Sequence, residues 1–319
     1  MGDALSIQGS AVGRWEPVTT DKDGTRGATL PPRPQSSGLV ETFVARRKTG
    51  FSDAKELVPD LNNASLQMFA DQESMQRSLN RIAVFVESSR KGEVLSDEEL
   101  RNHYANGNNK PYIGHDYQAR DLASFFNTAN KNGIKLNEAE EKLRSELLSQ
   151  GIITQNSSTK LDEAPVGNRT YIATSYEQGD RKTAITLNHE LIHARFFTDE
   201  KFAHKCRQYF NALPPNLQSQ VKETLSRLGY NKNDQDLMIN EFTAHMLVEN
   251  TFLKHDTADG ASRPGRDPRV AALFEKLSKF NGFLPREQLE TERSKLRSAL
   301  SGYNLPEYLE PYAKIESSS

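Results

Sequence analysis

The sequence lacks the features that identify most disulfide-bonded and membrane-spanning proteins. It contains a single cysteine, Cys206, in 319 residues, so no internal disulfide bond can form. This fits a protein that works in a reducing compartment, or one that is exported without oxidation. No apolar run approaches the roughly 18 residues that cross a bilayer, so no transmembrane segment is expected. The N-terminus also lacks the basic and then apolar pattern of a cleaved secretory signal.

An excess of charge of one sign is also lacking. Lysine and arginine number 41 against 43 aspartate and glutamate residues, which gives a formal net charge of −2. This balance gives no reason to expect nucleic acid or an acidic membrane surface as a partner. Hydrophobic residues make up only 35% of the chain, which predicts that part of it does not pack into a core.

The N-terminal sequence predicts a disordered leader over residues 1–60. Gly, Ser, Thr, Pro and charged residues dominate it, as in TTDKDGTRGATLPPRPQSSG, and no helical or strand period persists. Such a segment would serve as a linker or as an export or targeting signal. Gly2 and Ser6 in MGDALS match the pattern for N-myristoylation. The alternative is a chance match, and a single acyl chain would give only weak, reversible membrane contact.

Residues 61–151 are predicted to form a helical lobe. Apolar residues recur at helical spacing after Asp71, which is a candidate N-cap, and SDEE at Ser96 is a capping box. Two further helices are expected at 117–133 and 136–151, and both end at a glycine.

The pattern changes in the second half of the chain, where a core is expected over residues 152–260. RTYIATSYE (169–177) is rich in β-branched and aromatic residues and predicts a strand. Helices at the end of the chain, in residues 261–319, are expected to pack on this core. The fold class predicted is therefore α+β, predominantly helical with a short sheet. The helices expected after residue 198 span residues 200–212, 215–228, 234–250, 267–280 and 285–300.

The stretch TAITLNHELIHARFF (183–197) contains candidate zinc ligands and a candidate general base. His189 and His193 are four residues apart, so in a helix they lie on one face and can direct two imidazole nitrogens at one zinc ion. Glu190 is next to that face, where its carboxylate can act as a general base toward a metal-activated water. The surrounding residues are apolar, and buried His and Glu side chains are destabilising unless they are paired or bind a metal.

A catalytic zinc site also requires a third protein ligand and an open position for water. Glu241 lies in the apolar stretch NDQDLMINEFTAHMLVEN, where few partners other than a metal are expected. His245 follows one turn later and is an alternative third ligand or a transition-state stabiliser. Asp199 is disfavoured because Phe196 stands where that ligand set needs a glycine turn. His204 is expected to be a solvent-exposed helix residue.

NHELIHARFF followed by NEFTAH resembles the zinc peptidases of the gluzincin type, in which two histidines and a downstream glutamate bind the metal. The core HELIHA also resembles small zinc-endopeptidase effectors injected by type III secretion systems, which share a signal-less, disordered N-terminus and a reducing destination. The resemblance covers residues 169–250. It implies a zincin-like catalytic core, one zinc ion per chain and a protein or peptide substrate. It also implies a protein that is cytoplasmic, or secreted by a specialised system into a host cell cytosol.

The predicted reaction needs a substrate-binding strand and an oxyanion donor. The strand at 169–177 is expected to lie at the edge of the sheet, where an extended substrate can pair with it. The residues expected to pair are Tyr171, Ile172, Ala173 and Thr174. The candidate oxyanion donors are Tyr171, Tyr176, Tyr230, His245 and His255.

Two other functions are compatible with the sequence. One is a non-catalytic binding module that retains a zincin-like fold, although an inactive site would be free to lose Glu190. The other is a helical interaction protein in which the H-E-x-x-H match is accidental, as happens in roughly one chain in a hundred of this length. Stoichiometric zinc separates the second from a peptidase.

Overall fold

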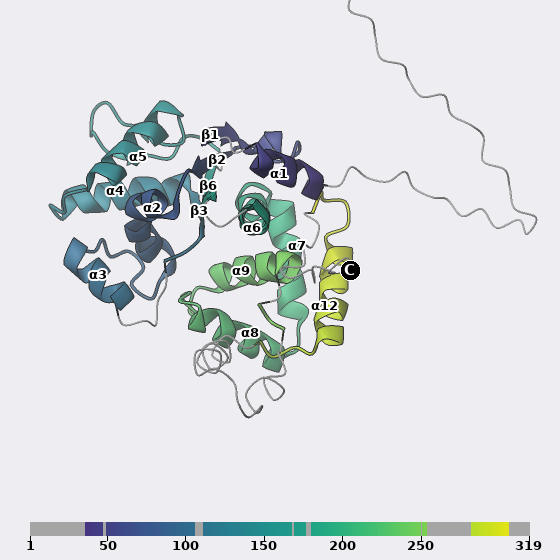
Figure 1. The fold of residues 1–319 in the computed structure, drawn as a ribbon. Helices are drawn as coiled ribbons and strands as arrows, with labels where there is room; N and C mark the ends of the chain where they lie inside the picture. Colours follow the sequence, from purple (N-terminus) through teal and green to yellow (C-terminus); the bar gives the residue numbers. More distant parts are fainter. Residues whose placement is uncertain are drawn as a thin grey trace, which may run out of the picture. The chain divides into compact units, whose positions relative to one another are not determined.

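The computed structural model describes residues 36–46, 49–105, 111–167, 169–176, 180–249, 251–253 and 282–305. All of them belong to the compact unit Gln35–Ser319. The described chain is mostly helical with a small mixed sheet, so the predicted α+β class is confirmed (Figure 1). No helix among the described residues is both long and apolar enough to cross a membrane. Gly2, His255 and the helix predicted at 267–280 lie outside the described residues.

The sheet has four strands in the order β1-β2-β6-β3. β2 and β6 are parallel, and the two outer pairs are antiparallel. These strands are β1 (Gly50–Asp53), β2 (Ala64–Phe69), β6 (Thr170–Ser175) and β3 (Gly114–Gln118), and a separate two-stranded sheet joins β4 (Thr154–Gln155) to β5 (Asp162–Glu163).

The strand predicted at 169–177 is confirmed as β6, but its predicted position at the sheet edge is wrong. β6 lies between β2 and β3, and Ile172 is opposite Leu66 on one side and Asp116 on the other. Tyr171, Ile172, Ala173 and Thr174 are fully buried and cannot receive a substrate strand. The reason is the same β-branched and aromatic composition that made the strand recognisable, because such side chains pack well on both faces of a central strand. The edge strand close to the H-E-x-x-H helix is β3.

Helices cover both faces of the sheet. In the first half of the chain they are α1 (Ser36–Ala45), the short 3-10 helix η1 (Ala54–Glu56), α2 (Gln72–Glu87), α3 (Asp97–Ala105), α4 (Ala119–Lys131) and α5 (Glu138–Ser149). In the second half they are α6 (Asp180–Thr198), α7 (Glu200–Ala212), α8 (Pro215–Arg227), α9 (Gln235–Val248) and α12 (Arg286–Ala299).

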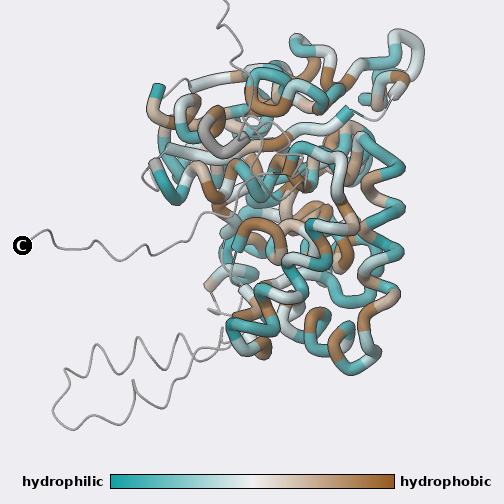
Figure 2. Tube along the Cα trace, turned by 90° about the vertical axis from the view of Figure 1, so that its right-hand side faces the viewer, coloured by the Kyte–Doolittle hydropathy of each residue, from teal (hydrophilic) through white to brown (hydrophobic). Residues whose placement is uncertain are grey.

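Alternation along β6 divides the core between the two sheet faces. Tyr171 and Ala173 pack with apolar residues of α2, α4 and α5, whereas Ile172 packs with residues of α1 and α6. Figure 1 shows α2, α4 and α5 on one side of the sheet and α6 on the other. In Figure 2, hydrophobic and hydrophilic residues alternate along the helices, as amphipathic helices require.

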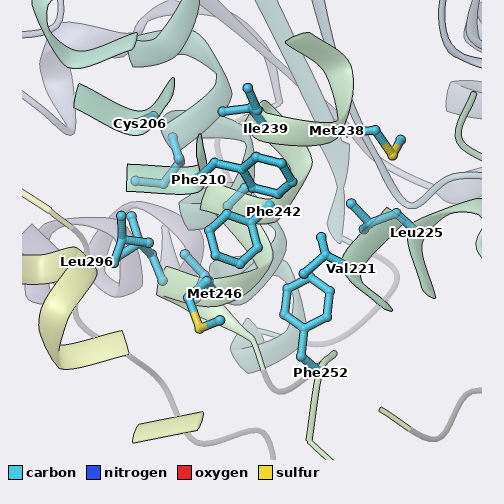
Figure 3. Close-up of a cluster of buried hydrophobic side chains, with 14 of the residues drawn as sticks. Cys206, Phe210, Val221, Leu225, Met238, Ile239, Phe242, Met246, Phe252 and Leu296 are labelled. Carbon is cyan, nitrogen blue, oxygen red and sulfur yellow. The ribbon is translucent and has the colours of Figure 1, made fainter. Parts of the chain in front are cut away.

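A third cluster joins α6 to α7, α8, α9 and α12. Phe210, Phe242 and Leu296 are fully buried in it, together with the free thiol of Cys206 (Figure 3). Because α9 packs against α6 and its interior residues from Met238 to Val248 are all buried, this cluster fixes how the two helices face each other.

The prediction of a disordered leader over residues 1–60 is wrong from residue 36 onward. Val40 and Val44 of α1 are fully buried against α6, and β1 pairs with β2 in the sheet. The apolar residues of this segment are too few to stand out from the polar sequence around them, and their order comes from packing on distant elements. Residues 1–35 lie outside the described residues.

The separation of a helical lobe (61–151) from the core (152–260) is also not observed. β2 and β3 come from the expected lobe, yet they flank β6 in one sheet. The helix predicted at 117–133 begins at Ala119 because Tyr117 and Gln118 belong to β3. The helix starts predicted from local sequence are confirmed for α2 and α12. Asp71 caps α2 by accepting from Ser74 N (2.7 Å), and α12 starts after Pro285.

Candidate metal centre

The two histidines of the H-E-x-x-H motif lie on α6, which packs against β6 and β3 on one side and α9 on the other. His189 is 6% exposed and His193 is 1% exposed. Their ring centroids are 4.6 Å apart, as expected for side chains one helical turn apart. α6 continues to Thr198 without a turn at Phe196, which agrees with the absence of a glycine there.

α9 brings Glu241 to these histidines. Oε2 of Glu241 is 3.7 Å from Nε2 of His189, and Oε1 is 3.7 Å from Nε2 of His193. These separations are too long for hydrogen bonds. Two ligands of a tetrahedral zinc ion with bonds of 2.0–2.1 Å are about 3.3 Å apart, so the spacing is close to that of a shared metal.

The donor set fits a metal such as zinc. His189, His193 and Glu241 each offer a ligand atom, and these atoms lie within 4.8 Å of one another. Oε2 of Glu241 is fully enclosed and has no hydrogen-bond partner, an arrangement that is unfavourable unless a cation is bound. Two imidazole nitrogens and one carboxylate oxygen form a common ligand set for catalytic zinc.

The charges in this cluster depend on one another. Burial alone would raise the pKa of Glu241, but His193 and His189 hold it below its usual value. Burial lowers the pKa of His193 to about 4. For His189 burial acts in the same direction, but the carboxylates of Glu249 and Glu241 outweigh it and raise the pKa. Without a metal, a proton on His189 therefore balances the buried carboxylates.

Glu190 lies on the side of α6 that faces β3. Burial, opposed in part by His189, raises its pKa to about 8. A carboxyl group that titrates near neutral pH suits a general base that must also return a proton. Gly114 of β3 leaves the space for it, because a Cβ atom at position 114 would overlap Oε1 of Glu190. Gly114 carries no sequence motif and was not among the predicted site residues.

Asp116, two residues along β3, faces the other motif histidine. Its Oδ2 is 3.9 Å from Nδ1 of His193, and the side chain is 10% exposed. Burial and the nearby Glu190 raise the pKa of Asp116 well above its usual value. β3 thus places one small and one acidic residue opposite Glu190 and His193.

Glu249 is a second acidic residue at the site that was not predicted from the sequence. It follows α9 and contacts two imidazole rings through one carboxylate. Its Oε1 is 2.9 Å from Nδ1 of His189, at an angle that is poor for a hydrogen bond, and its Oε2 is hydrogen-bonded to Nδ1 of His245 (3.0 Å). Arg293 of α12 donates to the backbone carbonyl of Glu249 (2.6 Å). Glu249 lies eight residues after Glu241, two helical turns further along, and this spacing was the only signal for it.

His245 and Tyr230 both lie at the site. Nε2 of His245 is 3.6 Å from Oε2 of Glu241, and its Nδ1 also lies 2.8 Å from Thr251 Oγ1. The ring of Tyr230 is 6.3 Å from that of His245 and stacks on Tyr112 at 5.5 Å.

Other candidates lie elsewhere. The Tyr171 hydroxyl donates to Gln67 Oε1 (2.6 Å), and Tyr176 packs with the cluster around α1. Both are therefore wrong as oxyanion donors. Asp199 caps α7 by accepting from Lys201 N and Phe202 N, and His204 is exposed on α7.

A groove with a volume of about 450 Å³ lies beside α9, next to the end of β3. It extends from Gln118 at the end of β3 to Asn240, the neighbour of Glu241, and on to α7. Neither the three candidate ligands nor Glu190 line this groove, so it borders α9 beside Glu241 without reaching the ligand atoms.

Comparisons with protein families, curated proteins and solved structures find no match to this chain. The functional inference therefore depends on the site itself and on the sequence resemblance of its motif.

Proposed function

We propose that this protein is a zinc-dependent endopeptidase that hydrolyses peptide bonds of a protein substrate. The observation that carries the proposal is the buried set of His189 and His193 from α6 and Glu241 from α9, with Glu190 beside it. The resemblance to gluzincin-type peptidases supports the same ligand set. The resemblance to type III effectors extends the proposal to a bacterial effector that acts on host proteins.

The residues divide into binding and proton-transfer roles. His189, His193 and Glu241 would hold one zinc ion, which when bound polarises a carbonyl group and activates a water molecule. Glu190 accepts a proton during the attack and passes it to the leaving amine. Its position against Gly114 keeps the carboxylate between α6 and the edge strand. His245 and Tyr230, which lie near Glu241 and near each other, would stabilise the transition state.

β3 would bind the substrate backbone. Ala119 N donates to Arg169 O (3.0 Å), across the β3-β6 pair. Hydrogen bonding alternates along an antiparallel strand, so Gly114 and Asp116 point their backbone N–H and C=O groups away from β6. Within the described chain, β6 is the sole strand neighbour of β3. An extended peptide can therefore pair with this edge next to Glu190 and His193.

Metal analysis of purified protein tests the ligand set. We expect one zinc ion per chain in the wild type and loss of that zinc in His193→Ala. His204→Ala is the matched control, because this histidine is exposed on α7, and it should keep the zinc. A wild-type protein without stoichiometric zinc after zinc loading would contradict the proposal and favour a helical interaction protein. Zinc binding without any peptide cleavage would favour a non-catalytic binding module.

A further inference from the structure

Glu87, the last residue of α2, is a buried acid that the proposed reaction does not use. It is 5% exposed. In the described part of the chain its carboxylate makes no hydrogen bond and no ion pair. A buried carboxylate without a partner is unfavourable, and in a native structure it points to a ligand or to a protonated group.

Glu87 contacts, through its backbone, the segment that carries Tyr230 at the candidate metal site. Its backbone carbonyl accepts from Asn231 N (3.1 Å), and the ring of the preceding residue, Tyr230, is 6.3 Å from His245. Electrostatics agree with this placement. Burial, together with the charges of Glu241 and Glu190, raises the pKa of Glu87 well above its usual value.

The edge strand would direct substrate side chains toward Glu87. On β3, Gly114 and Asp116 face α6, whereas Tyr117 packs with α2 and α4 on the other face of the sheet. A peptide that pairs with β3 alternates its side chains in the same way. Every second side chain of the peptide points to the α6 side of the sheet. The side chains between them point to the other side, where α2 ends at Glu87.

Within the described ranges, no ion pair supplies a countercharge for Glu87. The charge of Lys91 acts on Glu87, but the Lys91 ammonium group forms an ion pair with Asp234 (2.6 Å). Glu241 and Glu249 differ from Glu87, because both of their carboxylates lie next to histidines. Stacked Tyr112 and Tyr230 lie in the same region and offer aromatic faces, which favour cationic groups.

We propose that this site selects substrates with a lysine or arginine side chain near the scissile bond, and that Glu87 binds that side chain. The inference rests on the proposed peptidase function. The cationic group of the substrate would donate a charge-assisted hydrogen bond to the Glu87 carboxylate and balance its charge. Such bonds are stronger than those between neutral groups. Norleucine has a side chain of similar length without the charge, so it provides the matched comparison.

The test uses zinc-loaded protein and peptides in which a phosphinate replaces the scissile amide. The two residues before the phosphinate and the two residues after it are varied one at a time among lysine, norleucine and glutamate. At one position we expect lysine to bind at least about tenfold tighter than norleucine, and glutamate to bind weakest. Glu87→Gln should remove this preference, and Glu87→Asp should retain most of it. Glu73→Gln, an exposed acid on the same helix, should behave as wild type.

The outcomes separate this inference from the proposed function. Equal binding of the lysine and norleucine peptides by zinc-loaded wild type would overturn the inference and leave the peptidase proposal intact. A lysine preference that survives in Glu87→Gln would also overturn it. If the protein holds no zinc and binds none of the phosphinates, the proposed function fails, and the inference fails with it.

Discussion

Nε2 of His193 on α6 lies 3.7 Å from Oε1 of Glu241 on α9, although α7 and α8 separate the two residues in the sequence. The packing of α9 against α6 creates this proximity. It makes Glu241, and not its neighbour His245, the residue that completes a set of converging donors with both motif histidines.

The first prediction concerns this third ligand. Glu241→Ala should reduce bound zinc from one ion per chain to less than about a tenth, because two imidazoles alone do not complete a protein zinc site. His245→Ala should retain stoichiometric zinc. Metal analysis after dialysis against a weak chelator measures both. If His245→Ala loses zinc and Glu241→Ala keeps it, His245 is the third ligand and Glu241 is not.

The second prediction concerns Glu249, which contacts Nδ1 of His189. Carboxylates that hold a ligand histidine contribute to metal affinity through its orientation. Glu249→Gln should therefore weaken zinc binding about 10- to 100-fold in a chelator competition assay. Glu223→Gln, an exposed acid on α8, is the control. Unchanged affinity in Glu249→Gln would mean that the contact with His189 has no role in metal binding.

The third prediction concerns Gly114. An added Cβ would overlap the Glu190 carboxylate, so Gly114→Ala must displace the proposed base while leaving the three ligands in place. A displacement of about 1 Å can lower catalysis about 100-fold. We therefore expect a fall in kcat/KM of about that size with zinc content unchanged. Wild-type kcat/KM in this variant would show that Glu190 does not act from its position against β3.

The fourth prediction concerns pH and His115, whose Nδ1 lies 2.7 Å from the Tyr117 hydroxyl. Burial lowers the pKa of His115 to about 3, so the unfolded chain binds a proton below about pH 6.5 while the folded chain does not. Stability is therefore fully present above pH 6.5 and is lost as pH falls toward 3. Between pH 7 and pH 5 this group should lower the free energy of unfolding by about 2 kcal/mol.

Urea unfolding of chelator-treated protein at the two pH values measures this effect. His115→Gln should lose about 2 kcal/mol less than the wild type between pH 7 and pH 5. His204→Gln, at an exposed position, should show the wild-type loss. Identical losses in all three proteins would show that His115 takes up its proton in the folded state.

The sequence predicted features that local chemistry determines. The caps of α2 and α3 follow from Asp71 and from Ser96 with Glu99, whose reciprocal bonds are present (2.8 and 3.3 Å). The convergence of His189 and His193 follows from helical spacing alone. Glu241 was identified because an acidic residue in an apolar helix needs a partner.

Features that depend on strand order could not be predicted in the same way. Nothing within 169–177 indicates that β6 is flanked by both β2 and β3, because this depends on residues more than fifty positions away. For the same reason Gly114 and Asp116 were not recognised as site residues, since only the pairing of β3 with β6 brings them to α6.

Glu190→Gln provides the most direct test of the central claim. The substitution preserves the shape of the side chain and leaves the three proposed ligands untouched, but the amide cannot accept the proton. Wild type and variant should be compared on a peptide library derived from a proteome, with zinc content measured in the same samples. The account predicts equal zinc in both proteins, cleavage by the wild type, and at least about a 100-fold lower cleavage rate in the variant. Equal cleavage by the two zinc-loaded proteins would contradict it.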